Sequence, residues 1–553
     1  MTHDASDSFS RGYSGRDDDA PAMSLAARFA QEQREEAARE EAAAAPAEPA
    51  RQEPAEDDDG FGSPVVERSA PAAAAPREGD VVGPLKDFHW EPQPEGQKII
   101  DELTAAFLER CPEAAALAKK MTEQTGTRFR DWIDTIQVTG SDELADRLSA
   151  SGFTPKPQLL RSSLERGGSE SKHRYALYSH DRAMFPAVLL SEDETARIAI
   201  KVDLIADLAA ALSIPHDHRI FGEPGAQFRN ICVYRGEGTE LLAVERHGYR
   251  GYSTDVNVRS RSIAAAFHLE QFRRRQRFLG EDQAGFEHAN RLIDAAIPEI
   301  GEDWACDLFF QAEREYWMRR NRAARVQFAR QQSLGLGWAN HDHHTYRSSR
   351  RAFRHLVSFL EKLGFTCRER FYAGDEAGWG AQVLEQPNTG ITVFADVDLT
   401  PDELLANFAH DPLPPRAELG TVGLWCGLHG DSFLQAGMHH LECQFDWHAL
   451  SEQLEREAGI RMMEPFTTFP YLRQAFTEGE RWPVGEERVQ KLVAEGLITA
   501  EQAGTFREQG ALGSHLENLE RNDGFKGFNQ KGVDLIIAAT DPRHPDHLQL
   551  EGA

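Results

Sequence analysis

The fold is decided by residues 343–397, HHTYRSSRRAFRHLVSFLEKLGFTCRERFYAGDEAGWGAQVLEQPNTGITVFADV. This stretch predicts a strand over His343–Arg347 and a helix over Arg351–Leu363 that Gly364 ends. Three further strands are predicted, the last after a turn at Pro387–Gly390: Thr366–Tyr372, Gly380–Leu384 and Ile391–Val397. The order of elements is that of one βαβββ module.

Two weaker copies of this pattern precede it. A helix within Glu95–Lys120 precedes the first copy. This copy has one helix, Asp142–Gly152, and four strands: Trp132–Val138, Tyr175–Tyr178, Pro186–Leu190 and Arg197–Val202. A more degenerate second copy follows, with a helix at Val202–Leu212 and a hairpin of Asn230–Tyr234 and Glu240–Arg246. Repeated units of this kind indicate a fold built from tandem modules.

An enlarged fourth copy follows the quoted stretch. Its predicted strands are Thr421–Cys426, His440–Phe445, Leu516–Leu519 and Val533–Ala538, and its helices are His448–Glu457 and an inserted helical stretch, Gly485–Gly510. The fold class is therefore α+β, with tandem βαβββ modules, a helical insertion and a disordered N-terminal tail.

Four segments are predicted along the chain. Residues 1–85 form an acidic tail rich in Ala and Pro that cannot bury enough surface to fold alone, although Met23–Glu41 can form a helix that binds a protein partner. Residues 86–260 hold the degenerate module pair, 261–335 a helical connector whose arginines form internal ion pairs, and 336–553 the metal-bearing pair.

Composition excludes several classes of function. Lys and Arg total 61 against 90 Asp and Glu, and the net charge of −29 disfavours binding to nucleic acid or to an anionic membrane. No apolar run approaches the roughly 20 residues of a membrane span, and the N-terminus does not have the pattern of a secretory signal. The six cysteines form no Cys-x-x-Cys pair. We therefore expect a soluble cytoplasmic protein.

Histidines mark a candidate metal site. In the cluster at 341–344, His341 and Asp342 are expected in a loop, which leaves His343 as the best ligand from the strand. The pair His439-His440 opens the corresponding strand of the fourth module; only one of the two can face inward, and His440 is preferred over His439. Two histidines and one carboxylate form a facial iron site, for which Glu517 is the candidate carboxylate. Its competitors are Glu442, Asp446, Asp396 and Asp398.

The tandem modules, with a histidine opening a module strand and a glutamate on a later strand, resemble the vicinal oxygen chelate superfamily, whose four-module members include extradiol dioxygenases and 4-hydroxyphenylpyruvate dioxygenase. Glu517–Arg521 followed by Gly524–Gly527 is similar to the closing metal-ligand segment of the latter. His343–Arg347 and Glu245–Gly248 resemble metal-site motifs of the 2-oxoadipate dioxygenase/decarboxylase family, which leaves His247 as an alternative to His440.

The resemblance implies one Fe(II) or Mn(II) ion that binds a chelating pair of substrate oxygens. The expected function is a dioxygenase-like or lyase-like enzyme for a small carboxylate, a 2-oxo acid or a catechol-type molecule. Arg347, on the strand face of His343, can hold the substrate carboxylate by a bidentate contact. Two alternatives stay open: a metal-free binding or scaffold protein, and a glyoxalase-type isomerase.

Overall fold

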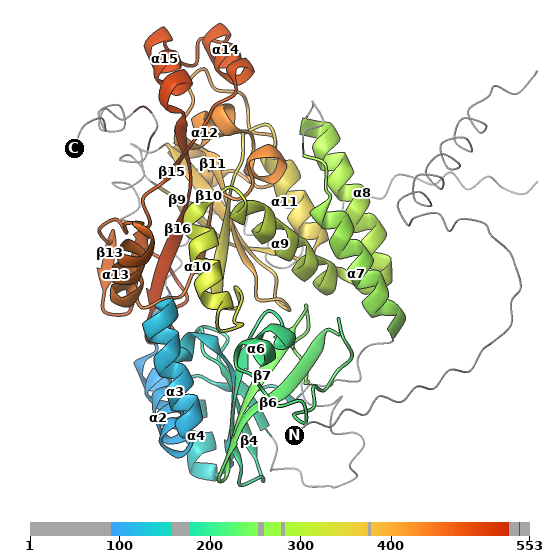
Figure 1. Cartoon of the computed structure of the whole chain (residues 1–553). Helices are drawn as coiled ribbons and strands as arrows, with labels where there is room; N and C mark the ends of the chain where they lie inside the picture. Colours follow the sequence, from blue (N-terminus) through green and yellow to red (C-terminus); the bar gives the residue numbers. More distant parts are fainter. Residues whose placement is uncertain are drawn as a thin grey trace, which may run out of the picture. The chain divides into compact units, whose positions relative to one another are not determined.

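The computed structural model describes residues 90–157, 176–252, 259–277, 282–373 and 378–529, together with Asp541 and Arg543. The expected tail, the helix at Met23–Glu41 and the strand at Val533–Ala538 lie outside these residues. Figure 1 shows the elements of the described chain, which form two mixed β-sheets with helices. The α+β class predicted from the sequence is confirmed.

The N-terminal sheet contains one complete module and one shortened module. The first runs β1 (Ile133–Thr139), α4 (Asp142–Ala150), β2 (Thr154–Pro155), β3 (Ala176–Ser179) and β4 (Ala187–Ser191). The second runs β5 (Ala196–Lys201), α6 (Ile205–Ala211), β6 (Phe228–Gly236) and β7 (Thr239–Arg246). The strand order is β2-β3-β4-β1-β5-β7-β6, and the first strand of each module pairs in parallel with its last.

The strand predicted at Arg197–Val202 therefore opens the second module instead of closing the first. An isolated antiparallel bridge between Phe221 and Asn230 lies where a fourth strand would pair in this module. Helices α2 (Pro94–Arg110) and α3 (Pro112–Lys120) precede the sheet, and a π-helical turn at Met121–Thr125 follows them.

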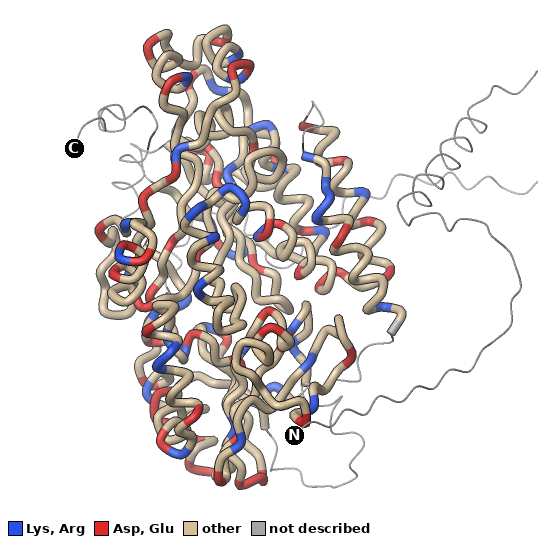
Figure 2. The backbone as a smooth tube through the Cα atoms, viewed as in Figure 1, with Lys and Arg blue, Asp and Glu red and all other residues tan. Residues whose placement is uncertain are grey.

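The connector consists of four helices: α7 (Arg259–Arg273), α8 (Asp282–Ile300), α9 (Glu302–Met318) and α10 (Arg322–Gln332). Its arginines form ion pairs, as the sequence predicts: Arg273 lies 2.6 Å from Glu315, and Arg275 lies 2.9 Å from the buried Glu313. Acidic and basic residues are interspersed along the backbone in Figure 2.

The C-terminal sheet has nine strands and two further modules. The third module is β8 (His341–Arg347), α11 (Phe353–Lys362), β9 (Thr366–Tyr372), β10 (Trp379–Glu385) and β11 (Thr392–Asp398). The fourth is β12 (His440–Cys443), α13 (Trp447–Ala458), β13 (Thr467–Phe469), β14 (Leu472–Phe476) and β16 (Ala511–Arg521), with β15 (Glu480–Trp482), α14 (Glu486–Ala494) and α15 (Ala500–Gln509) inserted before β16. Strands β8 and β12 join the two modules in antiparallel pairing.

One predicted strand is wrong. Thr421–Cys426 belongs to helix α12 (Thr421–His429). The run TVGLWCGLH is apolar on all sides, because Trp425 packs in one cluster and Leu424 in another, so its hydrophobic pattern does not distinguish a buried helix from a buried strand.

The two faces of the C-terminal sheet differ in character. Tyr346, Leu441 and Leu516 belong to the large apolar cluster that includes residues of α9 and α11. Since side chains alternate along a strand, the neighbours of these residues face the opposite side, where the candidate site lies. In the described part of the chain, no helix is both long enough and apolar enough to cross a membrane.

Candidate metal centre

Three adjacent strands, β8, β12 and β16, present two rows of polar side chains on one face of the C-terminal sheet. In the first row, Glu442 is in register with His343 on one side and with Glu517 on the other. In the second row, His440 is in register with Thr345 and His515. All six side chains belong to residues at most 8% exposed, so the site is shielded from bulk water.

The imidazole of His440, from the second row, reaches the imidazole and the two carboxylates of the first row. His343 Nε2 lies 3.1 Å from Glu442 Oε1, and His440 Nε2 contacts the same oxygen. His440 Nε2 also lies 3.6 Å from Glu517 Oε2. One ligand atom each from His343, Glu442 and Glu517 lies within 4.8 Å of the others. The structure thus brings together the three residues proposed as ligands from the sequence, and with them Glu442, one of the competing carboxylates.

Hydrogen bonds orient these ligands. His343 Nδ1 lies 2.9 Å from Asp342 Oδ1, which leaves Nε2 directed at the carboxylates. Thr345 donates to Glu442 Oε1 over 2.9 Å, and the Gln474 amide donates to Glu517 Oε1 over 3.3 Å. Partners of this kind fix the ring orientation and the tautomer of metal-binding histidines.

A β-bulge explains the position of Asp342. The consecutive residues Glu442 and Cys443 pair with His343 and His341, so Asp342 is the extra residue of β8. His341 and Asp342 are therefore in the strand, whereas a loop was expected. The His341 ring packs against that of His344, with centroids 5.2 Å apart, and not against His343.

Ionised carboxylates buried at this site would need a cation to offset their charge. Burial raises the pKa of Glu517 to about 8 and that of Glu442 well above its usual range, and it lowers the pKa of His440 well below its usual value. Among the described residues, neither Glu442 Oε2 nor His440 Nδ1 has a hydrogen-bond partner. Neutral imidazoles with carboxylates are a ligand set that suits Fe(II), Mn(II) or Zn(II), so the residues fit a divalent metal.

A cavity of about 60 Å³ adjoins the two rows. Arg347 lines it, is 5% exposed, and has an Nε without a hydrogen-bond partner in the described chain. The other walls include aromatic rings: Phe371, Trp379, Phe394, Phe466, Phe476 and Phe528. The cavity shares Arg347 and His515 with a larger cavity of about 440 Å³, and His343 with another of about 480 Å³.

The alternative ligands have other contacts. His247 lies between Asp307 (2.8 Å) and Glu245 (3.1 Å), which occupy both ring nitrogens. Although burial favours the neutral ring, these carboxylates raise the pKa of His247 to about 10. The adjoining Gly248 has φ +62°, and a Cβ there would lie 2.3 Å from Asp303 O, so the motif residue Gly248 has a structural role.

Three of the four competing carboxylates lie away from the proposed ligands. Asp398 accepts backbone N–H groups at the start of α12, and Asp446 caps α13. Asp396 lies in register with Arg347, and burial raises its pKa to about 8. Of the four competitors, Glu442 is the one in contact with the predicted ligands.

Sequence reasoning missed the roles of Thr345, His515, Asp342 and Gln474 at this site. The first two carry a signal in the sequence, because each is two residues from a predicted ligand on the same strand and so shares its face. Asp342 carries no such signal, since its position depends on the bulge.

No family model matches the chain, and no curated protein matches its sequence. Solved structures that match include a glyoxalase superfamily protein from Ralstonia eutropha JMP134, at 14% identity over 44% of this chain and 85% of that chain, with a TM-score of 0.26. A 4-hydroxymandelate synthase mutant from Streptomyces coelicolor matches at 11% identity over 75% and 98%, with a TM-score of 0.21. A fusion of a xylose isomerase-like TIM barrel with 4-hydroxyphenylpyruvate dioxygenase matches at 11% identity over 79% and 57%, with a TM-score of 0.20. At these values the matches do not assign the chain to a family.

Proposed function

We propose that the protein is a non-haem metal-dependent enzyme of the dioxygenase or lyase type that acts on a small carboxylate. His343, His440 and Glu517 would bind one Fe(II) or Mn(II) ion, with Glu442 beside them. The observation that carries this proposal is the convergence of these four buried side chains, from three neighbouring strands, beside a cavity lined by Arg347.

The bound ion would supply Lewis-acid chemistry and open coordination positions for substrate oxygens. Arg347 would hold the substrate carboxylate, since its buried guanidinium faces the cavity and its Nε has no hydrogen-bond partner among the described residues. Thr345 and Gln474 would hold the two glutamates in place, and the aromatic walls would exclude water. A 2-oxo acid or a catechol-type molecule offers the adjacent oxygens that such a site requires.

Glu442 favours a second candidate, a glyoxalase-type isomerase. A carboxyl group that touches both imidazoles and lines the cavity can accept and return a proton at a substrate carbon. Dioxygen consumption with a candidate 2-oxo acid supports the dioxygenase. Exchange of a substrate proton with deuterated solvent, without dioxygen consumption, supports the isomerase.

The metal content of protein purified without chelator tests the proposal. We expect bound iron or manganese in the wild type, and its loss in the variants His343→Ala and Glu517→Ala. His429→Ala is the matched control, because His429 is also buried but bonds to Leu512 O and lies outside the site. A folded wild type that holds no metal and cannot be loaded would contradict the proposal and favour a metal-free binding protein.

The role of Arg347 has its own test. Arg347→Lys keeps a positive charge but loses the planar fork that grips a carboxylate, so we expect KM to rise about tenfold or more with a smaller change in kcat. An unchanged KM in an Arg347→Lys variant that keeps its metal would exclude this role.

A further inference from the structure

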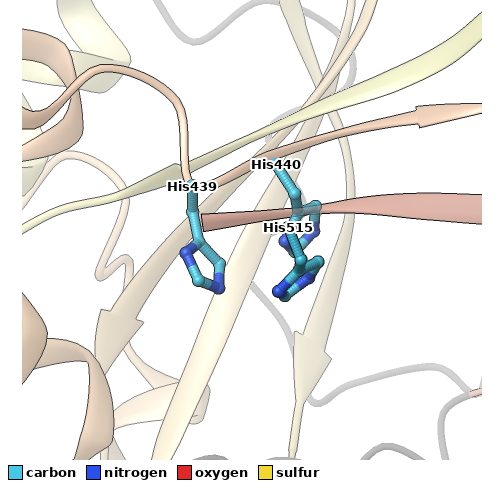
Figure 3. Close-up of side chains that lie close together, drawn as sticks. All are labelled: His439, His440 and His515. Carbon is cyan, nitrogen blue, oxygen red and sulfur yellow. The ribbon is translucent and has the colours of Figure 1, made fainter. Parts of the chain in front are cut away.

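A second group of ligand atoms lies beside the first. The imidazoles of His439, His440 and His515 each offer one nitrogen within 4.8 Å of the others. Figure 3 shows the three rings on the same side of the strands. The ring centroids of His440 and His515 are 4.5 Å apart, and that of His439 lies 4.7 Å from His440 and 4.9 Å from His515.

Local backbone structure explains how three histidines reach one place. His440 and His515 are register partners on the parallel strands β12 and β16, so their rings stand side by side. His439 directly precedes β12, so the alternation of a strand does not apply to it, and its ring lies with that of His440 instead of on the opposite face. The sequence alone predicts that only one of this pair faces the site.

The nitrogens of this group lack the partners that buried polar atoms normally have. His439 Nδ1 bonds to Gly513 O over 3.0 Å, which fixes the ring and leaves its Nε2 for another partner. Throughout the described chain, His440 Nδ1 and His515 Nε2 have no hydrogen-bond partner, although these residues are only 8% and 7% exposed. A buried polar atom without a hydrogen-bond partner destabilises the folded state, so we expect these nitrogens to bind a ligand.

We propose that His439, His440 and His515 hold a second divalent cation next to the proposed metal centre. A set of three imidazoles without a carboxylate suits Zn(II) or Cu(II), whereas the first row, with its two carboxylates, also suits Mn(II) or Fe(II). His440 belongs to both sets. Its Nε2 contacts Glu442 and its Nδ1 remains for a second ion, so with both ions bound His440 would bridge them as an imidazolate, its ring proton released to solvent.

Charge sets the fourth ligand of this second site. His439 and His515 are neutral and the single charge of the bridging His440 is shared by two dications, so the charge of the second ion is not offset. The guanidinium of Arg347 adds to it, and an anion must therefore complete the coordination. The cavity of about 440 Å³ is lined by His439, His515 and Arg347, and it has room for such an anion. The second site therefore takes a metal ion with an anionic ligand that Arg347 also contacts.

Zinc stoichiometry measured by dialysis and elemental analysis tests this inference separately from the proposed function. We expect two equivalents of Zn(II) in the wild type, one in His515→Gln, one in Glu517→Gln and two in the control His429→Gln. One equivalent that survives His515→Gln but is lost in Glu517→Gln would overturn the second site and leave the proposed function intact. One equivalent that is lost in His515→Gln but survives Glu517→Gln would support the three-histidine site and overturn the proposed centre at His343, His440 and Glu517.

A titration of the wild type with Co(II) does not depend on the folding of any variant. We expect two phases in the visible absorption, because a nitrogen-rich four-coordinate site absorbs more strongly than a six-coordinate site with carboxylates. A single weakly absorbing phase that ends at one equivalent would overturn the second site.

Discussion

Asp342 shows how a single residue can set the chemistry of the site. The bulge in β8 places its carboxylate against His343 Nδ1, while Arg521 holds the same carboxylate through Nε (2.7 Å) and Nη2 (2.9 Å). Although burial opposes ionisation, Arg521 and His343 hold the pKa of Asp342 far below its usual range. A charged Asp342 thus directs the Nε2 of His343 toward the proposed metal.

We predict that Asp342→Asn weakens metal binding by about 10- to 100-fold, because the amide orients His343 less firmly and makes it a poorer donor. Competition with a chromophoric chelator measures this affinity. Asp131→Asn is the control, since Asp131 also pairs with a buried arginine, Arg128, at 2.7 Å but does not contact the site. Equal metal affinities in wild type and Asp342→Asn would show that the bulge has no such role.

His247 gives the molecule a stability that depends on pH. Its pKa of about 10 in the folded chain lies above the ordinary value of 6.5, so the protonated ring stabilises the fold. This contribution is fully present below about pH 6.5 and is lost as the pH rises toward 10. Its full size is on the order of 5 kcal/mol.

We therefore expect the difference in unfolding free energy between wild type and His247→Gln to be largest near pH 6 and to shrink steadily toward pH 10. Urea denaturation of both proteins across this range measures the difference. If it stayed constant with pH, the ring would not be charged in the folded state.

The predictable part of the site follows from alternation along strands. His343, His440 and Glu517 could be chosen from their places in the modules. Glu442 was named only as a competitor, although alternation along the strand places it on the face of His440. The contacts of Asp342 and His439 could not be predicted, because a bulge and a strand end break the alternation.

At the scale of elements, helix α12 depends on one carboxylate from a neighbouring strand. Asp398, the last residue of β11, accepts backbone N–H groups from Gly420 (2.7 Å), Gly423 (3.0 Å) and Val422 (3.1 Å). These groups lie in the first turn of the helix, where no intrahelical acceptor exists. The glycines allow this approach, since a Cβ on Gly423 would lie 2.3 Å from the carboxylate.

We predict that Asp398→Ala lowers the free energy of unfolding by about 2 kcal/mol or more, because it leaves three backbone donors, one buried and two half-buried, without an acceptor. Asp446→Ala is the matched control. Asp446 caps α13 by accepting a single N–H, from Ala449 over 2.9 Å, and its loss should cost about 1 kcal/mol. Equal losses in the two variants, measured by urea denaturation, would contradict this account of α12.

Most elements could be predicted because their apolar residues recur with one clear period. The third module matches its expected ranges closely, since α11 presents one apolar face and β11 places Val393, Ala395 and Val397 in the same large cluster. Two kinds of element could not be predicted. Helix α12 is buried on all sides, and the short strands β13 and β15 have three residues each, too few to show a period.

At the scale of the whole described chain, the segment 121–126 joins the two module pairs. Gln327 donates to Thr125 O over 2.8 Å, Gln453 donates to Thr122 O over 2.9 Å, and the Asp446 N–H donates to Gly126 O over 2.9 Å. The acceptors precede the N-terminal sheet, whereas the donors belong to α10 and to the fourth module. The carbonyl groups at the end of this π-helical turn are thus satisfied by the C-terminal half.

Gly126 permits this close approach. It has φ +65°, and a Cβ at this position would lie 2.8 Å from Leu450 Cα and 2.9 Å from Leu450 N. We predict that Gly126→Ala lowers the free energy of unfolding by about 3 kcal/mol, of which about 1 kcal/mol reflects the positive φ and the rest the forced separation from α13. Gly459→Ala measures the cost of the positive φ alone, because Gly459 has φ +59° but a Cβ added there would meet no atom within 4 Å. Urea denaturation compares the two, and metal content should be unchanged in both, since neither glycine contacts the proposed ligands. If Gly126→Ala cost no more than Gly459→Ala, the close contact between Gly126 and Leu450 would not contribute to the stability of this junction.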